Sequence, residues 1–215
     1  MVTRVLRTKP WEVGARLRDL GLTVDVLREV ALDGFRARQS AGPLFPPTFP
    51  GTTAWAHCVN GLRSRLLPQG WRAADPGNFS MTISDLRRIY IVVATGDENA
   101  GLPFGELPST KTPKGMKTED AVRRQGSFWP DDDTATPAFC GTENYVGFWF
   151  LLNLSGRTIF TELSAPSDIQ DNKICDWAER NVLPKIDLDD TPLSRPDETD
   201  DPFGPQVEVP VKRIR

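Results

Sequence analysis

Residues 87–118 read RRIYIVVATGDENAGLPFGELPSTKTPKGMKT and contain the features from which the predicted fold and site are built. The run Ile89–Ala94 is almost continuously apolar, which is typical of a strand buried on both faces. Thr95, Gly96 and Asp97 follow it directly, and a long irregular segment with three lysines comes next. Loops at the end of a buried strand often form binding sites, so this segment is the first candidate for a functional site.

The rest of the chain alternates between helical and strand-like periodicity. Helices are predicted over five segments: 10–20, 23–38, 53–67, 116–124 and 167–181. Further strands are predicted over 79–83, 145–154 and 158–163, the last two as a hairpin. This order predicts an α+β fold with a mainly antiparallel sheet of about 4–5 strands, flanked by helices and covered on one face, with an N-terminal helical hairpin.

A proline-rich stretch divides the chain. Residues 39–53 contain four Pro and two Gly, a composition that argues against both helix and central strand. The predicted units are a helical hairpin (1–38), a linker (39–53), an α+β main domain (54–184) and an acidic, Pro-rich tail with a possible edge strand (185–215). An extended peptide that docks on a partner is the alternative for the linker.

The overall composition excludes several classes of protein. A net charge of −3 is too small to identify a charged partner. No apolar run has the length of a membrane span and no secretory apolar region follows the first Met, so no membrane partner is predicted. Three widely spaced cysteines predict reduced thiols in a cytoplasmic protein. The single histidine, His57, and the acidic run 131–133 give no metal-ligand pattern.

The lysine-rich part of the long segment predicts a phosphate site. Three ammonium groups are accompanied within nine residues by hydroxyl and backbone N–H groups, and a helix beginning nearby would add the positive end of its dipole. The spacing is not that of a P-loop, and a solvated charge run is the alternative. The predicted ligand-binding residues are Thr110, Lys111, Lys114, Gly115, Lys117 and Thr118.

Two carboxylates are weaker candidates, for catalysis. Asp97 can serve as a base or metal ligand, or it can bond to the backbone amides of a strand-terminating turn. Glu162 lies in the middle of a predicted strand, on the face opposite Ile159, where we expect it to pair with Arg157, Arg180 or a lysine.

Short motifs after the first long strand and in the later part of the chain occur together. They are Gly-Asp, P-x-T-K-x-P-K-G, E-L-S-x-P and W-x-E-R, at Gly96, Asp97, Pro108, Thr110, Lys111, Pro113, Lys114, Gly115, Glu162, Leu163, Ser164, Pro166, Trp177, Glu179 and Arg180. The set resembles bacterial proteins from mobile or accessory gene neighbourhoods that have no assigned activity. The resemblance implies a bacterial, cytoplasmic protein with a DNA-related context, and it implies no catalytic roles.

Three functions remain open at this point. The first is binding of a phosphate-bearing ligand, either nucleic acid or nucleotide, by the lysine-rich segment. The second is a protein-interaction or regulatory module that uses residues 1–50 and the acidic tail. The third is a metal-dependent hydrolase of degenerate restriction-endonuclease-like type, using Asp97 with Glu162 or Lys111, although the acid and lysine expected on the strand itself are missing. No pattern identifies a cofactor.

Overall fold

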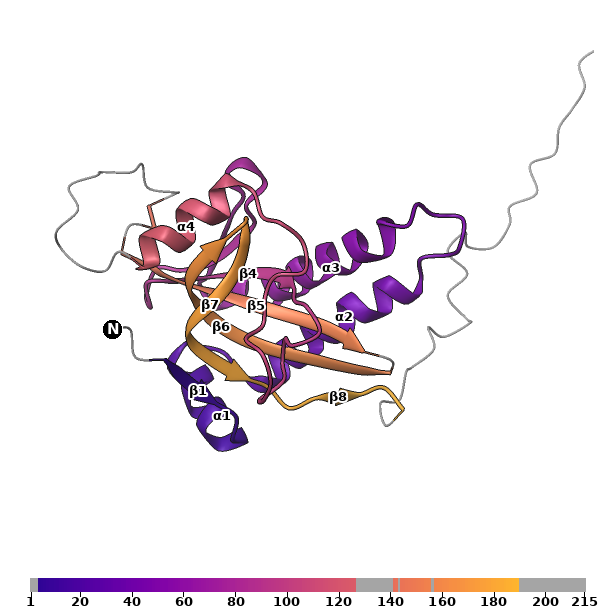
Figure 1. Ribbon diagram of the computed structural model, residues 1–215. Helices are drawn as coiled ribbons and strands as arrows, with labels where there is room; N and C mark the ends of the chain where they lie inside the picture. Colours follow the sequence, from indigo (N-terminus) through magenta and orange to yellow (C-terminus); the bar gives the residue numbers. More distant parts are fainter. Residues whose placement is uncertain (1–3, 127–140, 143, 156, 190–215) are drawn as a thin grey trace, which may run out of the picture.

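An eight-stranded mixed sheet runs through the protein, with strands in the order β1-β7-β6-β5-β4-β3-β2 and β8 paired to β6 (Figure 1). The computed structural model describes residues 4–126, 141–142, 144–155 and 157–189. The strands are β1 (Val5–Arg7), β2 (Arg72–Ala74), β3 (Met81–Ser84), β4 (Ile89–Thr95), β5 (Val146–Ser155), β6 (Thr158–Gln170), β7 (Lys173–Val182) and β8 (Ile186–Asp187). The helices are α1 (Pro10–Asp19), α2 (Val24–Gln39), α3 (Phe49–Leu66) and α4 (Met116–Gly126), with short 3-10 turns η1 (Leu67–Gln69) and η2 (Pro76–Asn78).

The predicted sheet was wrong in size and in strand direction, although the α+β class holds. β4 and β5 are parallel, from Ile89 opposite Val146 to Thr95 opposite Leu152, and β1 is parallel to β7. The other strand pairs are antiparallel. The connection between β4 and β5 contains α4 and is long enough to return the chain in the same direction, a choice that strand periodicity alone does not reveal.

The last predicted helix is in fact the hairpin of β6 and β7. Ile169, Ile174 and Trp177 have spacings that fit a helical face, but Ile169 and Ile174 are cross-strand partners. Asp171 and Asn172 form the turn with φ of 49° and 59°. Two consecutive residues of this type with positive φ favour the tight turn of a hairpin, and the pairing with β6 overrides helical spacing.

The proline-rich stretch contains the start of a helix, contrary to prediction. α3 begins at Phe49, and Pro50 stands in its first turn, where no intrahelical bond requires a backbone N–H. α2 and α3 pack closely because Gly34 has no side chain: a Cβ at that position would lie 2.2 Å from the Cys58 sulfur. The turn that joins the two helices lies at their outer end (Figure 1).

Both faces of the sheet are covered, whereas the sequence predicted one. α1, α2 and α3 share a core with one face, in which Leu17, Leu27 and Leu62 pack with Phe148 and Phe150. On the other face a second core joins α4 to the tip of the β6–β7 hairpin and includes Val122, Trp149, Ile174 and Trp177.

A glycine and a glutamine together fix α4 on the sheet. The Gln125 side chain donates to the carbonyl of Gly147 and accepts from its N–H, both at 2.9 Å. Gly147 is opposite Tyr90 in the β4–β5 pair, and a Cβ on it would lie 2.4 Å from the Tyr90 ring. The Tyr90 ring therefore occupies the space that a side chain at position 147 would need.

Several local predictions are confirmed with small shifts at the ends. They are the helices over 10–20, 23–38 and 116–124, the strand at Ile89–Ala94, and the hairpin of β5 and β6, although β6 continues past the predicted 158–163 to Gln170. The acidic run 131–133, Cys140 and the possible edge strand of the tail lie outside the described residues.

No helix in the described part of the chain combines the length and apolar character needed to cross a bilayer.

Candidate ligand-binding site

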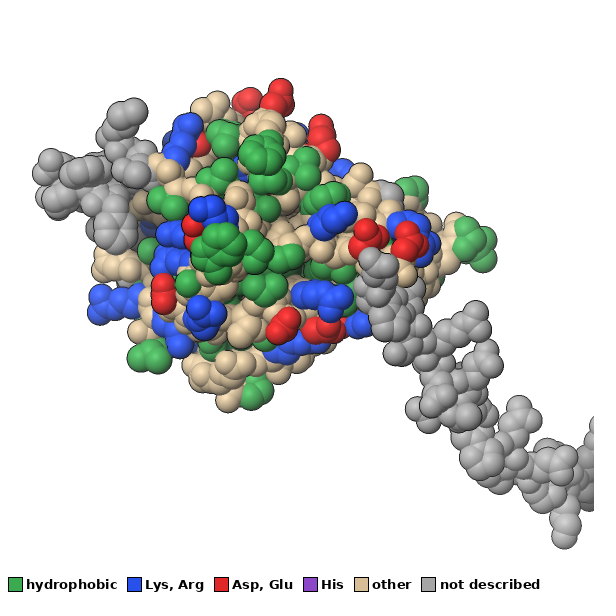
Figure 2. All heavy atoms as spheres, turned by 90° about the horizontal axis from the view of Figure 1, so that it is seen from below, with side chains coloured by type: hydrophobic (Ala, Val, Ile, Leu, Met, Phe, Trp, Pro, Cys, Tyr) green, Lys and Arg blue, Asp and Glu red, His purple; other side chains and the backbone are tan. Residues whose placement is uncertain are grey.

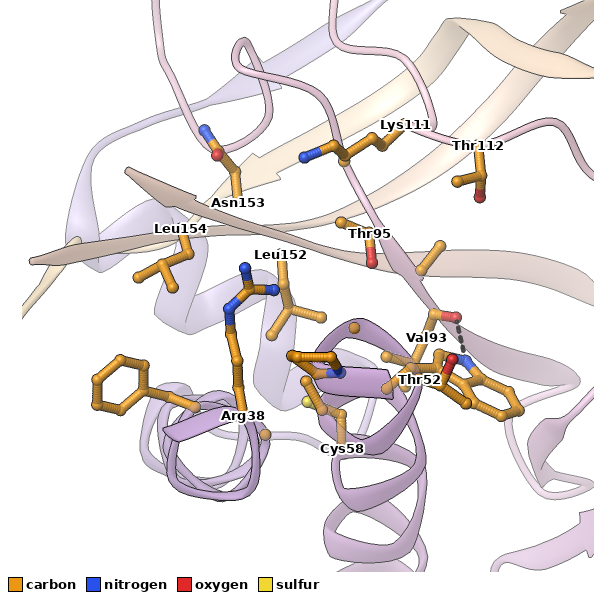
Figure 3. Close-up of a pocket in the computed structure, with 18 of the residues that line it drawn as sticks. Arg38, Thr52, Cys58, Val93, Thr95, Lys111, Thr112, Leu152, Asn153 and Leu154 are labelled. Atoms are coloured by element: carbon orange, nitrogen blue, oxygen red, sulfur yellow. Dashed lines mark hydrogen bonds between the residues drawn. The ribbon is translucent and has the colours of Figure 1, made fainter. Parts of the chain in front are cut away.

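A cavity of about 800 Å³ lies where β4 and β5 end. One wall comes from α2, the turn after it and the first turns of α3, and the opposite wall comes from the segment Lys111–Lys114 (Figure 3). The ends of β4 and β5 lie between these walls. The volume is within the range of small-molecule sites, which is roughly 300–1,000 Å³.

The parallel pairing of β4 and β5 brings two strand ends together at this cavity. Thr95 lies opposite Leu152, and the Gly96 N–H continues the pairing by donating to the Leu152 carbonyl at 2.9 Å. The pairing with β3 ends at Ile91, so the last residues of β4 have no strand on that side. The Trp55 indole N–H instead donates to the Val93 carbonyl at 3.1 Å, which fixes the indole ring of α3 at the cavity.

The lysine-rich segment is held in place by backbone hydrogen bonds. The Lys111 N–H donates to the Thr95 carbonyl at 3.0 Å, so the segment returns alongside the end of β4. The Lys114 N–H donates to the carbonyl of Asn172, in the turn of the β6–β7 hairpin, at 2.6 Å. The lysines therefore extend from a fixed backbone, which counts against the alternative of a flexible charge run.

Three cations and no acidic residue are found among the described residues that line the cavity. Figure 3 shows the Arg38 side chain extending from α2 toward Leu152, while Lys111 lies on the other side of the strands. Within the described residues, neither Arg38 nor Lys111 forms an ion pair or a side-chain hydrogen bond. Lys114 is half-buried, and this burial lowers its pKa below the ordinary lysine value. The cavity is thus positively charged, with walls that are largely apolar.

Four of the residues that the sequence grouped with these lysines do not line the cavity: Thr110, Gly115, Lys117 and Thr118. Thr110 is fully buried, and its hydroxyl accepts from the Ile174 N–H at 3.3 Å. The other three belong to the first turn of α4 or directly precede it. The structure therefore brings together only part of the predicted phosphate site.

Cys58 lines the cavity, but it is poorly suited to act as a nucleophile. Burial raises the pKa of its thiol to about 12, and the sulfur donates to the Val30 carbonyl at 3.4 Å. The neighbouring His57 is exposed on α3 and does not line the cavity.

The carboxylate of Asp97 is bonded to the backbone of its own loop. Its two oxygens accept from the N–H groups of Asn99 at 3.1 Å and Ser109 at 2.9 Å. This is the strand-terminating turn that the sequence left as an alternative to a catalytic role. Asp97 does not line the cavity.

Glu162 is fully buried and paired with Arg180, one of the partners expected from the sequence. It also accepts from the Ser164 hydroxyl at 2.8 Å and from the Gly101 N–H at 3.0 Å. Arg180 in turn donates to the Leu102 carbonyl at 3.0 Å. Both candidate catalytic carboxylates thus have internal partners.

In the described ranges, no three His, Cys, Asp or Glu side chains are grouped in a way that would hold a metal ion.

Sequence reasoning missed the half of the cavity that comes from α2 and α3. Arg38 and Trp55 are distant in sequence from Lys111, and they were assigned to a separate hairpin and to the face of a core helix. One signal was present: residues 34–74 contain no Asp or Glu. Such a stretch favours contact with an anion when the fold brings it to a cavity.

Comparison with protein-family models, curated proteins and solved structures finds no match to this chain.

Proposed function

We propose that the cavity binds a small organic phosphate of the nucleotide class. The observation that carries the proposal is the set of three cations around a cavity whose described lining contains no carboxylate. Charge-assisted hydrogen bonds from Arg and Lys are the common means of holding phosphate oxygens. The proposal keeps the phosphate ligand expected from the sequence and two residues of the predicted loop, Lys111 and Lys114, and it adds Arg38 from α2.

The shape of the cavity favours a nucleotide over a nucleic acid chain. It is bounded by helices, strand ends and the segment Lys111–Lys114 and has a volume of about 800 Å³, whereas a polymer needs an extended basic groove. Lys111, Lys114 and the Thr112 hydroxyl form a polar end suited to phosphate oxygens. Trp55 and Phe35, also in the lining, offer aromatic surface for a planar base.

Titration calorimetry with ADP, ATP and inorganic phosphate tests this proposal. We expect saturable binding of at least one nucleotide, and Lys111→Ala and Arg38→Ala should each weaken it about tenfold, as expected for the loss of one charge-assisted hydrogen bond. Lys117→Ala is the matched control, because Lys117 comes from the same sequence cluster but does not line the cavity. No nucleotide binding at low salt, or equal losses in all three variants, would contradict the proposal.

The same variants separate binding from folding. Since the side chains of Arg38 and Lys111 have no partner among the described residues, their removal should change the free energy of unfolding by less than about 0.5 kcal/mol. A cytoplasmic location belongs to this proposal as well, and the free thiols of Cys58 and Cys175 agree with it. A protein partner for residues 1–50 stays a prediction.

A further inference from the structure

The turn between α2 and α3 exposes a continuous apolar tip. Every residue from Pro43 to Thr48 is exposed, and five of these six residues are Pro, Leu or Phe. Leu44 is 99% exposed and Phe45 is 49% exposed. Hydrophobic side chains project at the right-hand end of the molecule in Figure 2, on the side where Figure 1 places this turn. We call residues 43–49 the hairpin tip.

The hairpin tip has a defined shape. The Phe45 and Phe49 rings stack with their centroids 4.1 Å apart. The Phe45 N–H donates to the Gly42 carbonyl at 3.3 Å, and the Phe49 N–H donates to the Pro46 carbonyl at 2.9 Å. The apolar side chains are therefore presented in a fixed arrangement, and little ordering is required when they leave water.

Among the described residues, the segment that contains the hairpin tip carries positive charge. Residues 34–74 contain no Asp or Glu, and Arg36 and Arg38 stand in the last turn of α2. Arg36 lies 3.3 Å from the Asp33 carboxylate, whereas Arg38 has no partner among the described residues.

Two acidic side chains at and after the end of β8 have cationic partners of their own. Asp189 is paired with Arg157, and Asp187 lies 3.7 Å from the Lys185 ammonium.

We propose that the hairpin tip inserts into the surface of a bilayer that contains anionic lipids. Exposed Leu and Phe enter the headgroup–acyl boundary, and neighbouring arginines are attracted to the negative surface. A protein partner is less suited, because a small convex tip needs a hollow of matching shape in the other protein, whereas a fluid bilayer adapts to it. The finding that no described helix spans a membrane does not bear on such a surface contact.

Vesicle flotation with the full chain tests the inference. We expect binding to vesicles of phosphatidylglycerol and phosphatidylcholine, weaker binding as salt rises, and little binding to phosphatidylcholine alone. Leu44→Asp should reduce binding to anionic vesicles by about tenfold or more, because it removes inserted apolar surface and adds a repelled charge. Leu44 is almost fully exposed, so this variant should fold normally, which its thermal midpoint will show.

Leu86→Asp is the matched control. Leu86 is 86% exposed and is followed by Arg87 and Arg88, but it lies before the start of β4, at the end opposite the cavity. Its vesicle binding should equal that of the wild type. Equal binding by Leu44→Asp and the wild type would overturn the inference.

Two further outcomes complete the test. Absence of wild-type binding to anionic vesicles would also overturn the inference, and a copurifying protein lost in Leu44→Asp would then identify a protein as the partner. Pro47 and Thr48 of the hairpin tip line the cavity but Leu44 does not, so nucleotide titration of Leu44→Asp should match the wild type. Vesicle binding and nucleotide binding can therefore fail independently.

Discussion

Two charged regions of this protein, one around Glu162 and one at the end of β4, differ in whether their charged side chains are paired within the fold. Around Glu162 every charge is matched within the fold, since its carboxylate is bonded to Arg180, Ser164 and the backbone of Gly101. At the end of β4, by contrast, Arg38 and Lys111 face a cavity whose described lining has no carboxylate. Matched buried charges hold a structure together, whereas unmatched cations beside a cavity are available to a ligand. Substitutions at Glu162, Glu179 and Asp97 test whether the internally paired carboxylates have the structural role described.

The largest effect is expected from breaking the pair of Glu162 and Arg180. Glu162→Gln leaves a buried guanidinium without its carboxylate, which should lower the free energy of unfolding by about 3–5 kcal/mol. Urea denaturation followed by circular dichroism measures this change.

The double variant Glu162→Met with Arg180→Met is the comparison for Glu162→Gln. It should be more stable than Glu162→Gln, since neither charge remains buried alone. If Glu162→Gln lowers the free energy of unfolding by less than about 1 kcal/mol, Glu162 and Arg180 do not form the buried ion pair described above.

A smaller, pH-dependent effect is expected at Glu179, which joins α1 and β1 to β7. Arg16 donates to its two oxygens at 2.6 and 2.9 Å, and Arg7 donates at 2.9 Å. Burial raises the pKa of Glu179, but the hydrogen bonds from Arg16 and Asn181 outweigh it and leave the pKa below 4.5. Glu179→Gln should therefore cost about 2 kcal/mol at pH 7.

The sign of the pH dependence follows from this lowered pKa. The stabilisation by Glu179 is complete above the ordinary glutamate range and is lost as the pH falls through the lowered pKa. The stability difference between wild type and Glu179→Gln should thus shrink below about pH 4.5. A difference that stays constant down to pH 3 would contradict the assigned ion pairs.

The smallest effect is expected at Asp97. Asp97→Ala removes the acceptor for two backbone N–H groups of the loop and should cost about 1–2 kcal/mol. Nucleotide affinity should change little, because Asp97 does not line the cavity. Metal-dependent hydrolysis of nucleic acid that disappears in Asp97→Ala, with stability intact, would instead restore the hydrolase hypothesis.

Much of the local structure could be predicted because it depends on neighbours in the sequence. The apolar run at Ile89–Ala94 gave a buried strand, and the charged start of the segment 116–124 gave α4. The hairpin of β6 and β7 was missed because its apolar spacing also fits a helix. Only its pairing within the sheet and with the loop distinguishes the two, as in the bond from the Ile174 N–H to Thr110.

The sequence alone determined the chemistry that this protein has available: lysines beyond a buried strand, and a Pro- and Phe-containing segment within a stretch that has no Asp or Glu. The tertiary structure alone decided which charged side chains lie close together. The hydrogen bond from the Lys111 N–H to the Thr95 carbonyl brings Lys111 to the same cavity as Arg38, and the β6–β7 pairing gives Glu162 its arginine. The physical reason is the sequence separation of the contacts involved. Periodicity reports contacts between residues a few positions apart, whereas strand direction depends on burial summed over the whole chain.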